Sequence, residues 1–293
     1  MDPARTIKGV WVIFDRGRDM LRYYADPDVR SFARRHDWAL LMPFHCAAKS
    51  YSDMDMDPQK GVGRALLTAL AQLAESSRHS EVASSKLILL GFSGTGALAP
   101  RLAAYAPDRV VAVVAADPGH FDPLGVDSIT LSARAASIPE LILTGSADAV
   151  SGTERPYAYF RKYFDNGAPW TFVVQNGTPH CCIINAKQVV LSWLDAVAIR
   201  RLARTVGWYG FVKTVPSTIA ECPAPQPPAV PVWCRGTKDS WGGNNWSVNA
   251  ATIARDSKTQ PDMLPAGWLP TRAFAQQWLS FVRLADHPIT SLP

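Results

Sequence analysis

The sequence lacks several features that would assign a function class at once. Its 293 residues hold 30 lysines and arginines against 25 acidic residues, without a block of basic residues. Acidic residues are interleaved with the arginines of the first third, so nucleic-acid binding is a poor explanation of the net charge of +5. No run approaches the roughly 18 consecutive apolar residues that a membrane span needs. We therefore expect neither a nucleic-acid partner nor a membrane partner.

The N-terminus and the cysteines leave the cellular compartment open. Residues 1–6 do not have the shape of a signal peptide, and a predicted strand follows within a few residues. This fits a cytoplasmic protein, or a secreted one whose signal has been removed. The five cysteines are an odd number, so at least one is unpaired. Cys222 and Cys234 flank a proline-rich stretch and are candidates for a disulfide, with free buried thiols as the alternative.

The chain up to about residue 206 alternates short apolar runs with segments of helical periodicity, a pattern typical of parallel βαβ construction. The runs are almost continuously apolar, as in strands covered on both faces. Strands are predicted at 9–14, 38–42, 87–90, 110–114, 141–143 and 171–174. Helices are predicted at 20–35, 61–77, 97–105, 154–164 and 186–204. The fold class is therefore α/β, with a mostly parallel, doubly wound sheet of about six strands.

The remaining part, 207–293, is rich in proline and tryptophan. Six prolines between 215 and 232 exclude a helix or a central strand there, so this stretch should run extended over the surface. A helix predicted at 271–284 places Phe274, Trp278 and Phe281 on one face, which needs a surface to bury against. We interpret 1–206 as the main domain and 207–293 as an extension packed on it. Alternatives for its aromatic residues are a lid and a carbohydrate-binding surface.

Ser93 is the most informative residue of the chain. It lies in Gly91-Phe92-Ser93-Gly94-Thr95-Gly96, between a predicted buried strand and a predicted helix. A strand, a tight glycine turn with a serine and then a helix is the context of a nucleophile elbow. Thr95 stands where the strict Gly-x-Ser-x-Gly pattern has its last glycine. The motif lacks the lysine of a P-loop, so phosphate binding is the weaker interpretation.

A base and an acid follow Ser93 in the order that a nucleophilic serine requires in doubly wound folds. Asp148 lies in the turn after the fifth predicted strand, and His180 lies in the loop after the sixth. Because parallel strands end at the same edge of a sheet, we expect the three side chains to lie together there. Asp117, after the fourth strand, is an alternative acid. We favour Asp148 because its turn is at the usual acid position.

At these residues the chain resembles the α/β-hydrolase family, in particular its serine esterase branch, which includes polyhydroxybutyrate-depolymerase-like and feruloyl-esterase-like proteins. The resemblance covers about residues 7–206. It rests on the strand order and on Gly91-Phe92-Ser93-Gly94, Gly145-Ser146-Ala147-Asp148 and Pro179-His180. It implies an α/β-hydrolase fold and a serine hydrolase that cleaves carboxylic esters through an acyl-enzyme. Ser93 would be the nucleophile, His180 the base and Asp148 the acid, with no cofactor.

The resemblance also implies an oxyanion hole made of backbone amides. The counterpart of the family's oxyanion loop is Phe14-Asp15-Arg16-Gly17-Arg18-Asp19, which departs from the family pattern in its first two residues. The expected donors are the amides of Gly94 and Arg16.

Loops at the same sheet edge should form the substrate pocket. The residues expected to line it are Phe44, His45, His120 and Phe121. His45, His120 and Cys181 have no zinc-type spacing, so we expect no metal. The implied partner is a small-molecule or polymeric ester, and the sequence indicates no oligomeric state. The alternatives are a thioesterase, an amidase or an acyltransferase that uses the same three residues, and an inactive binding protein of the same fold.

Overall fold

The structure of the protein is a computed structural model, and it describes residues 5–15, 20–43, 56–119, 121, 125–164, 166–175, 178–180, 186–199, 235–238, 251–254, 265–268, 274, 277–278 and 281. The strands are β1 (Gly9–Phe14), β2 (Trp38–Leu41), β3 (Lys86–Phe92), β4 (Val110–Ala116), β5 (Glu140–Gly145), β6 (Trp170–Gln175), β7 (Arg235–Lys238), β8 (Ala251–Ala254) and β9 (Pro265–Trp268). They form one sheet in the order β2-β1-β3-β4-β5-β6-β9-β7-β8.

The strands β1 to β6 are all parallel, which confirms the predicted α/β class. Every residue of β1, β4, β5 and β6 is buried, as the continuously apolar runs indicate. The predicted strands lie at the observed positions, but β3, β4, β5 and β6 extend further than their apolar runs. Their ends contain charged, polar or small residues that the apolar signal does not include.

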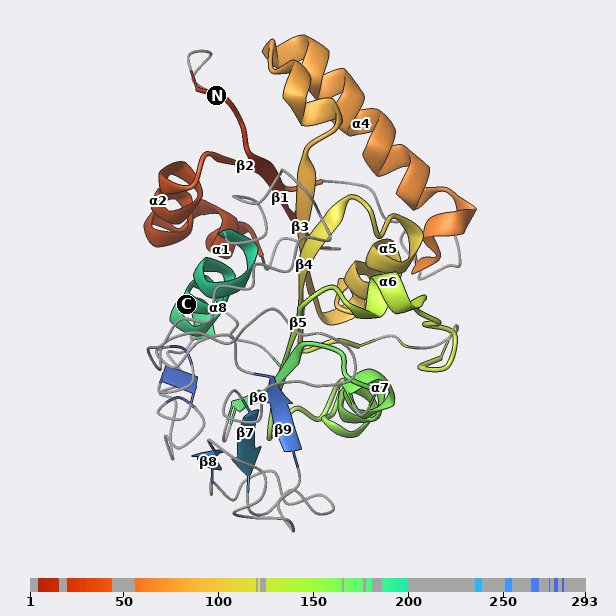
Figure 1. Cartoon of the computed structure of the whole chain (residues 1–293), viewed down its shortest axis with the longest axis vertical. Helices are drawn as coiled ribbons and strands as arrows, with labels where there is room; N and C mark the ends of the chain where they lie inside the picture. The colour runs from red at the N-terminus through yellow and green to blue at the C-terminus, as the bar shows by residue number, and fades with distance from the viewer. Residues whose placement is uncertain are drawn as a thin grey trace, which may run out of the picture.

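Helices cover both faces of the parallel part of the sheet (Figure 1). On one side lie α1 (Leu21–Ala25), α2 (Pro27–Arg35) and α8 (Lys187–Leu194). On the other lie α4 (Val62–Ser77), α5 (Leu98–Tyr105), α6 (Ala133–Ala136) and α7 (Glu154–Phe164). Single 3₁₀ turns are η1 (Pro58–Lys60), η2 (Ser80–Ala83) and η3 (Ser93–Thr95), and a π-helical turn, η5 (Asp195–Ile199), follows α8. No described helix is long and apolar enough to cross a membrane.

Two predicted helices differ from the structure. The helix predicted at 20–35 is divided into α1 and α2, because Pro27 has no N–H to continue the hydrogen-bond ladder of α1. Asp26 instead caps α2, where its side chain accepts hydrogen bonds from the amides of Asp28 and Val29. The helix predicted at 186–204 is α8 followed by η5, and residues 200–204 lie outside the described residues.

The strand order reverses direction at β1 and β3. The chain passes from β1 outward to β2, then returns across β1 to β3 and continues to β6. Doubly wound sheets bind ligands at such a switch point, outside the carboxyl ends of the strands. Phe14 ends β1, and its register partner in β3 is Gly91, one residue before the end of that strand. Ser93 follows directly after β3, so the switch point coincides with the predicted nucleophile.

The described residues of the extension contact the main domain. β9 pairs with β6 in the antiparallel sense, and β7 connects β9 to β8. These three short strands were not predicted from the sequence. Phe274, Trp278 and Phe281 are buried, and the indole N–H of Trp278 donates to the carbonyl of Phe172 in β6 at 3.2 Å. The proline-rich stretch 215–232 and all five cysteines lie outside the described residues.

Glu140 begins β5 with a buried side chain. The hydroxyl of Tyr159 in α7 donates to its Oε2 at 3.2 Å. Burial raises the pKa of Glu140 to about 8, against a smaller lowering by the Tyr159 hydrogen bond. In the unfolded chain the same carboxyl group ionises near its ordinary pKa of 4.5. Between these two values the folded protein holds a proton that the unfolded chain has released.

We predict that stability falls as pH rises from about 5 to 8 and that Glu140→Gln removes this component. The folded state binds more protons than the unfolded state in this range, so the slope of the unfolding free energy is negative, at most about 1.4 kcal/mol per pH unit for one group. Urea unfolding of wild type and Glu140→Gln at several pH values measures it, with the exposed Glu75→Gln in α4 as the control. Equal pH dependence of wild type and Glu140→Gln would contradict it.

Candidate active site

The turn after β3 holds Ser93 in a strained conformation. Its φ is 52°, in the left-handed region that non-glycine residues rarely adopt. A Cβ atom on Gly91 would lie 2.0 Å from the carbonyl oxygen of Thr95, and one on Gly96 would lie 2.5 Å from the Cα of Pro118. Both positions therefore require glycine. The resulting turn leaves the Ser93 side chain partly exposed at the carboxyl edge of the sheet.

Two backbone amides fix the carbonyl group of Ser93. Gly96 donates to it at 2.8 Å from within the turn, and Gly119 donates at 2.9 Å from the segment after β4. These two hydrogen bonds connect the turn that holds Ser93 to the segment after β4 as well as to its own helical turn. These bonds help to offset the cost of the unfavourable backbone conformation.

Thr95 replaces the last glycine of the strict motif and connects β3 to β1. Its hydroxyl oxygen accepts from the amide of Phe92 at 3.0 Å. Its hydroxyl hydrogen faces two carbonyl oxygens, of Phe92 at 2.9 Å and of Phe14 at 3.0 Å. Phe14 ends β1, and the segment expected to supply an oxyanion donor begins directly after it. Thr95 therefore holds the start of that segment beside the turn.

We predict that Thr95→Val lowers the free energy of unfolding by about 1–3 kcal/mol, because the buried amide of Phe92 loses its acceptor. Valine has nearly the same shape as threonine, so the loss reports the hydroxyl group. Denaturant titration measures the change, and Thr95→Ser, which keeps the hydroxyl, is the matched control. A Thr95→Val protein as stable as wild type would show that these hydrogen bonds do not hold the turn.

The turn after β5 holds the carboxyl group of Asp148. A Cβ atom on Gly145 would lie 2.2 Å from the carbonyl oxygen of Thr178, so this position also requires glycine. The backbone amides of Val150 and Ser151 each donate to Oδ1 of Asp148 at 2.8 Å. The amide of Ala147 donates to the carbonyl of Thr178 at 3.0 Å, which ties this turn to the segment before His180. Backbone hydrogen bonds thus fix the carboxyl group of Asp148 independently of its contact with His180.

His180 links the other two predicted residues in one hydrogen-bonded chain. Its Nδ1 lies 2.7 Å from Oδ2 of Asp148, and its Nε2 lies 2.8 Å from Oγ of Ser93. The ring also stacks on Phe92, with centroids 5.6 Å apart and an interplanar angle of 25°. Loops after three different strands therefore bring a hydroxyl, an imidazole and a carboxyl group together.

The pKa of Asp148 determines where the protons lie in the hydrogen-bonded series of Asp148, His180 and Ser93. Burial acts to raise the pKa of Asp148, but the hydrogen bond from His180 and those from the Ser151 and Val150 amides outweigh it and lower the pKa. An ionised carboxylate only accepts hydrogen bonds, so Nδ1 of His180 carries the proton. Nε2 is then free to accept a hydrogen bond from the Ser93 hydroxyl.

Asp117, the alternative acid, lies close to Asp148 but not on the histidine. It is buried at the end of β4 with a φ of 39°, and neither carboxyl oxygen has a hydrogen-bond partner of normal geometry in the described part of the chain. Burial and then the charge of Asp148 raise its pKa well above the ordinary value, against a smaller effect of the Gly145 amide. The surroundings therefore shift the pKa values of the two carboxyl groups in opposite directions, down for Asp148 and up for Asp117.

We predict that amide substitutions at the two acids differ strongly in their effect on activity. Asp148→Asn should lower the activity of Ser93 on the order of 10³- to 10⁴-fold, because an amide does not hold the Nδ1–H form of His180. Asp117→Asn keeps the shape of a side chain whose carboxyl oxygens have no hydrogen-bond partner of normal geometry among the described residues, so it should change the activity less than about threefold. The rate of fluorophosphonate labelling at pH 7 measures both. A larger loss in Asp117→Asn than in Asp148→Asn would reverse the assignment of the acid.

The other residues expected from the sequence have different outcomes. Gly94 is buried directly after Ser93, at the start of η3, where backbone amides have no acceptor within the helical turn. The ring of Phe121 is buried, with its centre 6.1 Å from that of the Tyr159 ring in α7, and its place in a substrate pocket stays a prediction. Those that lie outside the described residues are Arg16, Phe44, His45, His120 and Cys181.

The sequence interpretation missed residues that support the three side chains. Phe92 is named from the sequence only as a member of the Gly91-to-Gly96 motif, yet its ring stacks on His180. Ser151 was not singled out, yet its amide binds Asp148 and its Oγ lies 3.3 Å from Nδ1 of His180. The only available signal for Ser151 is its place three residues after an aspartate, where an aspartate side chain commonly accepts backbone hydrogen bonds.

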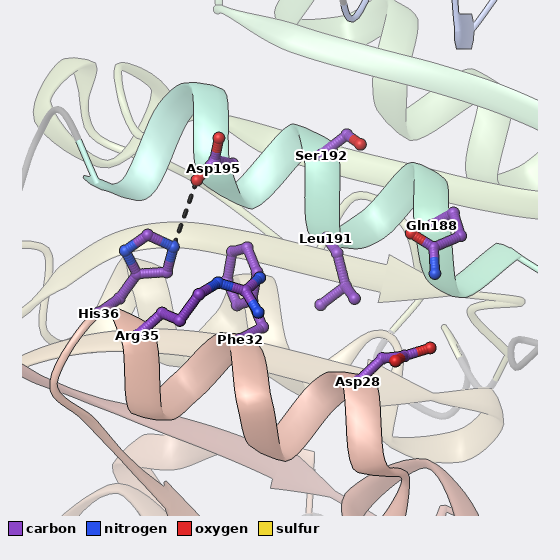
Figure 2. A pocket seen from close by; sticks show the side chains of 8 residues that line it. All are labelled: Asp28, Phe32, Arg35, His36, Gln188, Leu191, Ser192 and Asp195. Atoms are coloured by element: carbon purple, nitrogen blue, oxygen red, sulfur yellow. Dashed lines mark ion pairs between the residues drawn. The ribbon is translucent and has the colours of Figure 1, made fainter.

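A surface groove of about 380 Å³ lies elsewhere, between α2 and α8 (Figure 2). Phe32 and Leu191 lie between the two helices, and His36 and Asp195 form an ion pair of 3.3 Å at one end. The other lining residues are Asp28, Arg35, Gln188 and Ser192. Ser93, Asp148 and His180 do not line this groove, so it is separate from the candidate active site. Within the described ranges, no three histidine, cysteine or acidic residues are grouped to hold a metal ion.

Comparisons with known proteins gave matches only among solved structures. No family model and no curated protein sequence matches the chain. A thermostable esterase is 18% identical with a TM-score of 0.49, and the match covers 67% of this chain and 56% of that protein. Esterase PE8 is 17% identical with a TM-score of 0.48, covering 66% of this chain and 94% of that protein. The esterase Pf2001 of Pyrococcus furiosus is 14% identical with a TM-score of 0.47, covering 67% and 85%.

Sheet topology and site geometry together define the kind of protein this is. Six parallel strands, helices on both faces and a serine on a strained strand-to-helix turn make a doubly wound α/β protein whose turn after β3 has the form of a nucleophile elbow. This is the fold class that the sequence predicts.

Proposed function

We propose that the protein is a serine hydrolase that cleaves carboxylic esters through an acyl-enzyme. The observation that carries this proposal is the continuous hydrogen-bonded chain from Oδ2 of Asp148 through both ring nitrogens of His180 to Oγ of Ser93. A serine hydroxyl is a weak nucleophile at neutral pH unless a neighbouring base removes its proton. His180 is that base, and the carboxylate of Asp148 orients it.

The first half of the reaction forms the acyl-enzyme. Oγ of Ser93 attacks the ester carbonyl carbon while its proton passes to Nε2 of His180. The imidazolium that results is stabilised by the ionised Asp148. The tetrahedral intermediate then collapses: the bond to the alcohol oxygen breaks, and this oxygen takes the proton from Nε2. The acyl group remains on Ser93.

The second half returns the enzyme to its starting state. Nε2 takes a proton from a water molecule, whose oxygen attacks the acyl carbon. Collapse of this intermediate breaks the bond to Oγ and returns the proton to Ser93, so the products are a carboxylic acid and the free enzyme. No cofactor takes part in either half.

Backbone amides would stabilise the negative oxygen of both intermediates. Gly94 is the residue after the nucleophile and the second residue of the 3₁₀ turn η3, so its N–H is suitably placed as a donor. Arg16 would supply the second donor. This choice is supported by the register of Phe14 opposite Gly91 and by the Thr95 contact to Phe14, which hold the end of β1, two residues before Arg16 in the sequence, beside the elbow.

A fluorophosphonate probe and a substrate panel test the proposal. The wild-type protein should be labelled and should hydrolyse p-nitrophenyl esters. Ser93→Ala should lose all labelling and should lower kcat on the order of 10⁴- to 10⁶-fold, because no other group replaces the nucleophile.

Ser146→Ala in the neighbouring loop is the control for a serine substitution as such. Faster turnover of acyl-CoA or anilide substrates than of any ester would point to a thioesterase or an amidase. Labelling that persists in Ser93→Ala would contradict the assignment of the nucleophile.

A further inference from the structure

Ser151 contacts more than one part of the candidate active site, although no role follows for it from the three-residue mechanism. It lies between Asp148 and α7. Its backbone N–H donates to Oδ1 of Asp148 at 2.8 Å, and its Oγ lies 3.3 Å from Nδ1 of His180. The side chain that orients the base and the base itself thus share a second neighbour.

The Nδ1 atom of His180 faces two oxygen atoms. Oδ2 of Asp148, at 2.7 Å, is the stronger acceptor, and Oγ of Ser151, at 3.3 Å, is the longer and weaker one. A hydrogen atom on Nδ1 that is shared between two acceptors resists rotation of the ring more than one held by a single acceptor.

Gly119 makes room for the Ser151 hydroxyl. A Cβ atom at position 119 would lie 2.6 Å from Oγ of Ser151, too close for any real contact. The amide of the same glycine donates to the carbonyl of Ser93 at 2.9 Å. The segment after β4 therefore contacts both the turn of Ser93 and the side chain of Ser151. A Cβ atom at position 119 would displace the Ser151 hydroxyl group.

We propose that Ser151 is a positioning residue of the active site, whose hydroxyl is the second hydrogen-bond acceptor of the Nδ1–H of His180. It acts through the histidine and does not touch the reacting atoms. This inference rests on the proposed function, since it assumes that His180 is the base that activates Ser93.

The test compares Ser151→Ala with Ser151→Thr by the second-order rate constant of fluorophosphonate labelling across a range of pH. Both variants keep the backbone amide that binds Asp148, so a difference between them reports the hydroxyl group. Ser151→Ala should label about three- to tenfold more slowly at the plateau, as expected for the loss of one long hydrogen bond to a charged group. Ser151→Thr, which keeps a hydroxyl group, should restore the wild-type rate.

Two further variants keep the test decisive. Gly119→Ala should reproduce the slower labelling of Ser151→Ala, because its Cβ displaces the same hydroxyl. Ala149→Ser changes an exposed side chain of the same loop and should behave as wild type. Thermal unfolding of each variant shows whether the fold is intact.

The possible results separate this inference from the proposed function. If Ser151→Ala labels at the wild-type rate with an unchanged pH profile, the role of Ser151 is disproved while the hydrolase remains. If the wild type labels but turns over no ester, the ester assignment fails and the labelling rates still decide on Ser151. A wild-type protein that is not labelled at all would overturn both.

Discussion

The backbone at Ser93 is the constraint on which the rest of the site depends. A left-handed φ at a serine costs free energy, on the order of 1–2 kcal/mol. The surroundings hold it there by hydrogen bonds from two backbone amides to its carbonyl and by two glycines that permit close backbone contacts. The strain is thus maintained by contacts within the turn and with the segment after β4.

The sheet shifts the pKa values of three carboxyl groups in different directions. Asp148 accepts hydrogen bonds from two backbone amides and an imidazole, so its pKa is lowered although its side chain is buried. Asp117 has burial and a negative neighbour but no comparable donors, so its pKa is raised. Glu140, at the opposite end of β5 from Gly145, has a single tyrosine hydroxyl, and burial raises its pKa to about 8. The number of hydrogen-bond donors, rather than depth in the fold, decides the direction of each shift.

The sequence predicts the parallel sheet and the sequence positions of the three site residues, because continuous apolar runs and glycine turns are local signals. It does not predict the division of the first helix at Asp26, where one proline outweighs the helical periodicity of a longer segment. The buried place of Phe121 and the contacts of Ser151 depend on how loops far apart in the sequence meet. No periodicity or motif within one segment carries that information. The short strands β7, β8 and β9 were not predicted because, unlike the equally short β2, none of them is a continuous apolar run.

The central claim is that Ser93 carries the acyl group during turnover. The most direct test is peptide mapping by mass spectrometry of protein quenched within milliseconds of mixing with p-nitrophenyl acetate. The account predicts one added acetyl group, located on Ser93. An acetyl group on another residue, or p-nitrophenol release at full rate with no adduct on the protein at any time, would contradict it.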